Sequence, residues 1–196
     1  MQQGIEEEGT LWKGLVAGLA AGLVASWTMN QFQAAWTRVA AGFEKPHGAQ
    51  AMQPSEGPNP DEFGDPIAKQ QSPAEKENQD DATVKTARAI SEGVFGHELK
   101  ESEKRAAGAM VHYAFGTATG GLYGAMAEVA PQVTTGAGIP FGAAFWAIAD
   151  EAAVPLLGLA KGPTEYPLST HAYSLASHLV YGLTAEMSRR ALRQVL

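Results

Sequence analysis

Four long stretches without a charged residue constrain this chain more than any other feature. They cover residues 14–37, 106–127, 129–149 and 166–185, and each holds 20 to 24 residues. An α-helix rises about 1.5 Å per residue, so about 20 residues cross the roughly 30 Å hydrocarbon core of a bilayer. The stretches therefore predict an all-α, polytopic membrane protein built as a bundle of four transmembrane helices.

The charge of the chain is concentrated between the first two predicted spans. Residues 39–107 hold thirteen acidic and eight basic side chains, and they supply −5 of the net charge of −7. Six of the eleven prolines lie within residues 43–80, a composition typical of a flexible linker. The chain divides into residues 1–38 with the first span, a polar Pro-rich loop over 39–107, and residues 108–196 with three spans and a basic C-terminal end.

A short amphipathic helix is predicted at residues 81–95, near the end of this loop. Asp81 can cap its first turn, and Gly96 suits the position after its last turn. Apolar residues with helical spacing share one side: Val84, Ala87, Ile90 and Val94. Such a helix lies at a membrane interface or docks on another protein.

Small residues recur at every fourth position in the first two predicted spans, which places them on one stripe of each helix. Stripes of small residues let two helix backbones approach closely in lipid. We predict a tight right-handed pair of spans one and two, or contact of either stripe with another span or another subunit. The stripe residues are Gly14, Gly18, Gly22 and Ser26 in the first span, and Gly116, Gly120 and Gly124 in the second.

Each predicted span also carries a polar or ionisable residue at a similar depth. Counted from the loop side, these residues occupy a slab roughly 9 to 18 Å below the surface. A buried ionisable group without a partner costs several kcal/mol, so we expect these side chains to face inward and to pair. The slab consists of Asn30, His112, Asp150, Glu151 and His178.

The two carboxylates of the slab are adjacent in sequence and therefore point about 100° apart on a helix. We expect either Asp150 or Glu151 to pair with His178. The other carboxylate is expected to face Asn30, the bend at Pro155 or a partner subunit.

Three interpretations of the slab remain open. It can be an interhelical hydrogen-bond clamp. It can be a proton or ion relay, because carboxylates and imidazoles in a low-dielectric site titrate near neutrality. It can also hold a haem or a metal, for which His112 and His178 are the weak candidate ligands. No cofactor is predicted.

Ionisable residues near the predicted membrane surfaces receive simpler interpretations. Glu128 and Glu186 lie near Arg189 and Arg190 at the side of the two termini, where ion pairing or solvation is expected. His171 is predicted to be interfacial. Basic residues are divided too evenly between the two sides to fix the orientation of the protein in the membrane. The first span follows an acidic N-terminal segment and is predicted to be an uncleaved anchor.

Several function classes are excluded or not indicated by the residues. The chain has no cysteine, which excludes disulfides, iron–sulfur clusters and covalent c-type haem. Its acidity and the lack of basic tracts argue against nucleic-acid binding. No G-x-S-x-G or H-E-x-x-H motif is present, and the glycine run of the second span lacks the lysine of a phosphate-binding loop. An enzyme is therefore not predicted.

Four segments together resemble a known family. They are KGLVAGLAAGLVASWTMNQFQAAW, HYAFGTATGGLYGAMAE, ADEAAVPLLGL and HAYSLASHLVYGLTAE. They look like the YagU-type family of uncharacterised bacterial inner-membrane proteins. The most specific motifs are His112-Tyr113-x-Phe-Gly and Asp150-Glu151-x-x-x-Pro155. The resemblance implies a multi-pass protein of the bacterial cytoplasmic membrane, and it implies no activity, ligand or catalytic residue.

The glycine stripes and the acidic loop lead to a functional expectation. We expect an accessory or assembly subunit of a larger membrane complex, or a self-associating protein, that contacts lipid and a protein partner through the 39–107 loop and the stripes. One alternative is a bundle that conducts protons or ions, or responds to acid, through the slab. A second alternative is a redox subunit that binds haem or a metal.

Overall fold

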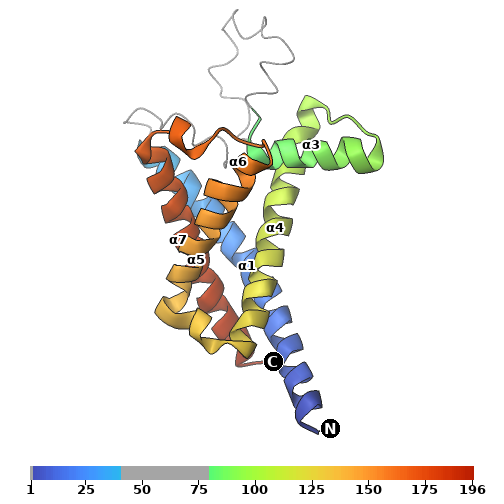
Figure 1. The fold of residues 1–196 in the computed structure, drawn as a ribbon, viewed down its shortest axis with the longest axis vertical. Coiled ribbons are helices and arrows are strands. Elements are labelled where there is room, and N and C mark those ends of the chain that lie inside the picture. The colour runs from blue at the N-terminus through green and yellow to red at the C-terminus, as the bar shows by residue number, and fades with distance from the viewer. Residues whose placement is uncertain (1, 41–79) are drawn as a thin grey trace, which may run out of the picture.

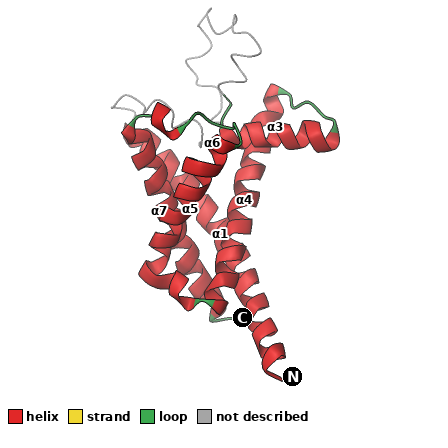
Figure 2. Cartoon of the chain, in the orientation of Figure 1, coloured by secondary structure: helices red, strands yellow, loops and turns green. Residues whose placement is uncertain are grey.

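A computed structural model describes residues 2–40 and 80–196, which form helices and no strand (Figures 1 and 2). The long helices α1 (Gln2–Ala40), α4 (Glu101–Val129) and α7 (Leu168–Arg193) run along one bundle with the shorter α5 (Ile139–Ile148). Helix α1 begins and α7 ends at the same end of the bundle. The all-helical fold is thus confirmed, and all of the predicted Pro-rich linker except Asp80 lies outside the described residues.

Two helical segments are long and apolar enough to cross a membrane, Thr10–Val39 and Pro131–Leu156. Helices α4 and α7 are long enough, but they carry many glycine, serine, histidine and tyrosine residues. The prediction of membrane helices is therefore supported for the first and third predicted spans. A bundle of four spans stays a prediction.

Helices α1 and α4 pack closely along their two stripes of small residues. A methyl group added at Gly22 would lie 2.6 Å from the backbone oxygen of Gly116 and 2.9 Å from the Cα atom of Gly120. Gly18 faces Gly120 and Gly124 in the same way. Both predicted stripes are thus used for one contact within the chain.

A second glycine contact joins α5 to α7. A methyl group at Gly182 of α7 would lie 2.8 Å from the backbone nitrogen of Gly142 in α5, and Gly138 also lies against Gly182. Gly138 and Gly142 are four residues apart, the same spacing as in the α1 and α4 stripes. This contact was not among the predicted ones.

The third predicted span, built around the uncharged stretch 129–149, is not one regular helix. It consists of a 3₁₀ segment η4 (Pro131–Gly138), then α5, a π-helical turn η5 (Ala149–Ala153) and a last turn α6 (Val154–Leu156). Residues 136–138 have positive φ angles, so the regular helix starts only after them. Pro155 has no N–H group and clashes with the carbonyl of the preceding turn, which explains the wider π turn just before it.

Burial in the bundle is the reverse of that in a soluble protein. Among the described residues no leucine, isoleucine, phenylalanine or tryptophan is fully buried. Alanine, glycine, serine and tyrosine fill the interior, together with His178, Gln33 and Glu186. Large apolar side chains cover the outside, and only 11% of the apolar window within Pro131–Leu156 is buried.

The predicted short helix forms as α3 (Ala82–Phe95). The Asp81 side chain accepts a hydrogen bond from the backbone N–H of Val84, and Gly96 ends the helix in the left-handed conformation. Burial raises the pKa of the Asp81 carboxyl, and the hydrogen bonds from Thr83 and Val84 oppose that rise. Helix α3 packs on α4 and lies across it (Figure 1).

Candidate functional site

Two clusters of ionisable residues lie in the bundle, one toward each end. The carboxylate–histidine cluster consists of Asp150, Glu151, His171, Ser174 and His178, and it lies toward the end opposite the termini. Both carboxylates belong to the π turn η5. The two histidines are seven residues apart on α7, so they lie on the same face of that helix, two turns apart.

The inner pair of this cluster is Asp150 with His178. The His178 Nδ1 atom lies 3.4 Å from Asp150 Oδ2, and both side chains are more than nine-tenths buried. The Ser174 hydroxyl donates a 2.5 Å hydrogen bond to the same Asp150 oxygen. His178 Nδ1 also lies 3.0 Å from the backbone oxygen of Ser174, which can only accept, so Nδ1 carries a proton. The second ring nitrogen of a neutral His178 is then left to bind a further proton.

The outer pair is Glu151 with His171, and each side chain is about one-fifth exposed. His171 Nδ1 lies 2.6 Å from a Glu151 carboxylate oxygen, and Nε2 lies 2.9 Å from the backbone oxygen of Pro163. A carbonyl oxygen only accepts, and so does an ionised carboxylate. With Glu151 ionised, both ring nitrogens must donate, and the geometry then fits a protonated His171.

The structure pairs the residues of the predicted slab differently from what we expected. We expected only one of Asp150 and Glu151 to pair with a histidine, but both do, because His171 also faces the π turn. His171 was predicted to be interfacial and received no role. Its position two turns before His178 on one helix face is the signal that could have identified it.

The other two slab residues lie on α1 and α4. Asn30 donates a 3.1 Å hydrogen bond to the Tyr113 hydroxyl. The Nε2 atom of His112 is buried without a hydrogen-bond partner in the described part of the chain. Asn30 and His112 thus lie outside the two carboxylate–histidine pairs.

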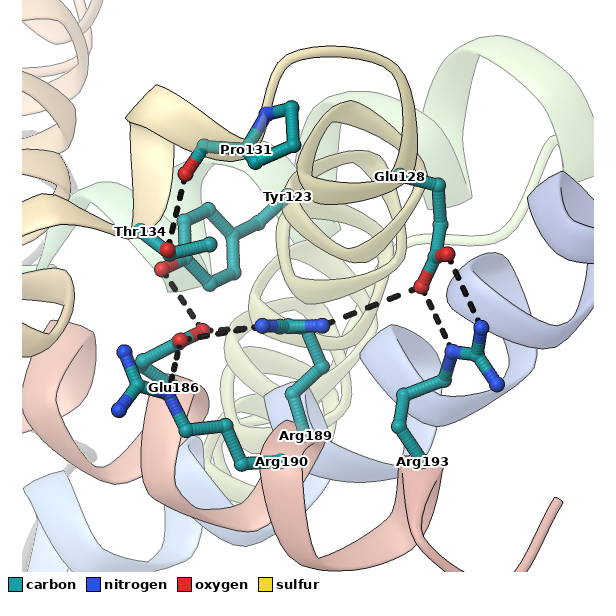
Figure 3. Close-up of polar contacts among 8 residues, drawn as sticks. All are labelled: Tyr123, Glu128, Pro131, Thr134, Glu186, Arg189, Arg190 and Arg193. Atoms are coloured by element: carbon teal, nitrogen blue, oxygen red, sulfur yellow. Dashed lines mark hydrogen bonds and ion pairs between the residues drawn. The ribbon is translucent and has the colours of Figure 1, made fainter.

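The second cluster lies at the end where α1 begins and α7 ends (Figure 3). We call it the arginine–glutamate cluster; it comprises Tyr123, Glu128, Glu186, Arg189, Arg190 and Arg193. Its centre is the fully buried Glu186, which accepts two hydrogen bonds of 2.8 and 3.0 Å from Arg189 and one of 2.5 Å from Arg190. The Tyr123 hydroxyl donates a fourth hydrogen bond, of 2.9 Å.

The outer pair of this cluster joins α4 to α7. Arg193 donates hydrogen bonds of 2.6 and 3.0 Å to the two carboxylate oxygens of Glu128. The hydrogen bonds and charge of Arg193 lower the pKa of Glu128, and burial opposes that shift only in part. The predicted ion pairing of Glu128 and Glu186 therefore exists, although Glu128 pairs with Arg193 more closely than with Arg189, which lies 3.9 Å away.

Sequence reasoning missed Tyr123 and Ser174. Tyr123 is a buried residue of α4, and its only polar atom reaches Glu186 on α7, 63 positions later in the chain. No local spacing connects the two. Ser174 lies four residues before His178, so a search for polar neighbours on the face of the histidines would have found it.

The chemistry available to the carboxylate–histidine cluster is proton exchange. Within residues 2–40 and 80–196, no group of three or more histidine, aspartate or glutamate side chains is arranged to hold a metal ion. Imidazole and carboxylate pairs bind and release protons at physiological pH.

Comparison with known proteins adds a family. A protein-family model described as "Protein of unknown function (DUF1440)" matches residues 86–187, more than half of the chain. The matched region contains α4, α5, most of α7 and the carboxylate–histidine cluster, and it excludes α1. No curated protein and no solved structure matches the chain.

Proposed function

The chain belongs to the DUF1440 family of proteins of unknown function, and we propose that it is a four-span helical protein of the bacterial cytoplasmic membrane that responds to pH. The reversed burial supports the membrane placement. A soluble helix bundle hides leucine and phenylalanine, whereas this one exposes them and buries glycine, alanine and polar groups. The motifs that resemble the YagU-type family agree with the same placement.

The four-span topology can be tested by labelling. The chain has no cysteine, so Glu98→Cys and Gln194→Cys each introduce one unique thiol at an exposed position. Four spans put residue 98 and residue 194 on opposite sides of the membrane. A membrane-impermeant maleimide added to spheroplasts should label one of them and not the other. Equal labelling of both would contradict the topology.

We propose that the carboxylate–histidine cluster binds protons at the loop side of the bundle. The observation that carries this proposal is the position of His171 between two acceptors, the Glu151 carboxylate and the Pro163 carbonyl. Only the doubly protonated ring can donate to both. The Asp150–His178 pair, with both side chains more than nine-tenths buried, continues the series of titratable groups toward the interior.

The arginine–glutamate cluster argues against free passage of protons through the whole bundle. Three guanidinium groups lie at that end and remain charged at every physiological pH. Fixed positive groups of this kind repel protons in membrane pores. The geometry therefore favours proton binding over proton conduction. In this arrangement the carboxylate–histidine cluster takes up protons from one side of the membrane and changes its charge there.

The protonation state of His171 can be measured directly. Solid-state ¹⁵N NMR of the protein in bilayers at pH 7 should show an imidazolium histidine that disappears in His171→Gln and shifts to the neutral form in Glu151→Gln. Glu98→Gln, which changes an exposed glutamate outside the cluster, is the matched control and should leave the signal unchanged. A neutral His171 at pH 7 in the unaltered protein would overturn the proposal.

Proton flux into liposomes separates binding from conduction. We expect flux at the background level for the unaltered protein, for Asp150→Asn and for His178→Ala. Flux well above background that these two substitutions abolish would replace the proposal with a proton-conducting bundle.

A second candidate function is an accessory or assembly subunit of a larger membrane complex. The net charge of −5 in the 39–107 loop favours this role, because such a charge offers a partner a distinct acidic surface. The α1 and α4 stripes already pack on each other, so the loop is the part of the predicted partner surface that is left. Copurification in mild detergent tests this role, and recovery of a monomer with a protease-sensitive loop would contradict it. A Soret band in the purified protein would instead support haem near His112 and His178.

A further inference from the structure

Half of the apolar side of α3 packs on the bundle and half is exposed. Val84 and Ala87, in the first half, are buried, and a methyl group at Gly108 of α4 would lie 2.8 Å from the Val84 side chain. In the second half, Ile90 is 46% exposed and Val94 is 72% exposed. The helix projects past α4 (Figure 1), and the apolar side chains of its second half are uncovered.

Ion pairs determine which side of α3 faces the start of α4. Lys104, one turn before Gly108 on α4, pairs with Asp80 at 2.9 Å, and Asp80 also pairs with Arg88 of α3 at 3.6 Å. The Arg88 side of α3 is therefore turned toward the beginning of α4, which is the end of the bundle opposite the termini.

The exposed apolar residues point the other way. Two residues of an α-helix turn by about 200°, so Ile90 lies on the opposite side of α3 from Arg88. Val94 follows Ile90 by about one turn and shares its half of the helix. These two side chains consequently point along α4 toward the middle of the bundle, beside its exposed apolar surface.

We propose that α3 is an interfacial helix whose second half inserts Ile90 and Val94 into the lipid surface. The inference rests on the membrane placement proposed above. Helix α3 lies across α4, so it runs parallel to the membrane plane when the bundle spans the bilayer. Its charged side, with Arg88 and Glu92, then faces water, and its apolar side faces the acyl boundary, as in other interfacial helices.

This arrangement also places the start of α3 at the membrane surface. Asp80 and Asp81, directly before the helix, are both held by contacts within the chain.

Spin labels on single cysteines test the insertion of α3. The full chain is reconstituted in vesicles of phosphatidylethanolamine and phosphatidylglycerol, and the accessibility of each label to oxygen and to a water-soluble nickel chelate is measured. Labels at Ile90→Cys and Val94→Cys should collide more with oxygen than with nickel. The matched control Glu92→Cys, on the charged side of the same helix, should show the reverse.

Leu122→Cys, at an exposed position within α4, separates failure of this inference from failure of the membrane placement. Oxygen access at residue 122 combined with nickel access at 90 and 94 would overturn the interfacial helix and leave the bundle in lipid. Access to neither reagent at 90 and 94 would mean that protein covers them, which also overturns it. Nickel access at residue 122 would overturn the membrane placement and the inference together.

Discussion

The two ionisable clusters place different chemistry at opposite ends of the bundle. Toward the termini, Glu186 and Glu128 are held by arginine side chains, whose guanidinium groups keep their charge over the whole physiological range. Toward the other end, Asp150 and Glu151 are held by histidines, which gain or lose a proton near neutrality.

The difference indicates that the two ends of the bundle have different roles. The arginine–glutamate cluster joins α4 and α7 by contacts that do not change between pH 5 and pH 8, so it can serve as a fixed clamp. The carboxylate–histidine cluster joins η5 to α7 through imidazole groups, the class of side chain whose ordinary pKa lies closest to neutrality. Measurements of the free energy of unfolding at the two pH values therefore test this difference between the clusters.

The largest effect is expected at Glu186. Glu186→Ala removes the acceptor of four hydrogen bonds and leaves Arg189 and Arg190 without their buried partner. Removing one member of a buried ion pair costs about 3–5 kcal/mol. Unfolding in detergent micelles should show a loss of this size, equal at pH 5.5 and pH 8. A loss no greater than that of the exposed control Glu98→Gln would show that the cluster is not a clamp.

The next effect is expected at Asp150. Asp150→Asn keeps a side chain of the same shape but removes the charge that faces His178, and we expect a loss of about 1–3 kcal/mol. Unfolding in detergent micelles measures the loss. A loss no greater than that of the exposed control Glu98→Gln would show that the Asp150–His178 pair does not stabilise the bundle.

Much of this arrangement follows from local sequence patterns. The four-residue spacing of Gly14, Gly18 and Gly22 predicts a close helix contact, and the caps Asp81 and Gly96 define α3, because both features depend on positions a few residues apart. Helical spacing and capping act within one element. They are therefore visible in a single sequence.

The contacts between elements could be predicted only in part. Depth counting placed His178 and Asp150 at the same level, but it could not show that the π turn before Pro155 aims both carboxylates at α7. A change of about one residue in helical register redirects a side chain, and Pro155, which accounts for the turn, does not by itself specify which side chains face α7. The pairing of Tyr123 with Glu186 likewise depends on how α4 and α7 cross.

A smaller effect is expected at Tyr123. Tyr123→Phe removes one hydrogen bond to Glu186 and leaves its arginine partners in place, so the loss should be about 1 kcal/mol. The loss should not change between pH 5.5 and pH 8. Tyr166→Phe, which removes a hydroxyl in a surface loop, is the matched control and should cost less. An equal loss for both variants would mean that the buried hydroxyl adds nothing to the clamp.

The smallest effect is expected at Glu128, and it tests where the clamp itself becomes sensitive to pH. Arg193 lowers the pKa of Glu128 below its ordinary value of 4.5. A carboxyl with a lowered pKa stabilises the folded state above its unfolded pKa, and this contribution is lost as the pH falls through the folded pKa. Glu128→Gln should therefore cost about 0.5–1 kcal/mol, the range for a partly exposed pair, at any pH from 8 down to about 5. The cost should vanish only below pH 4.5.

A cost of Glu128→Gln that already declines between pH 8 and pH 5.5 would show that both ends respond to pH in the same range. The contrast between the clusters would then fail.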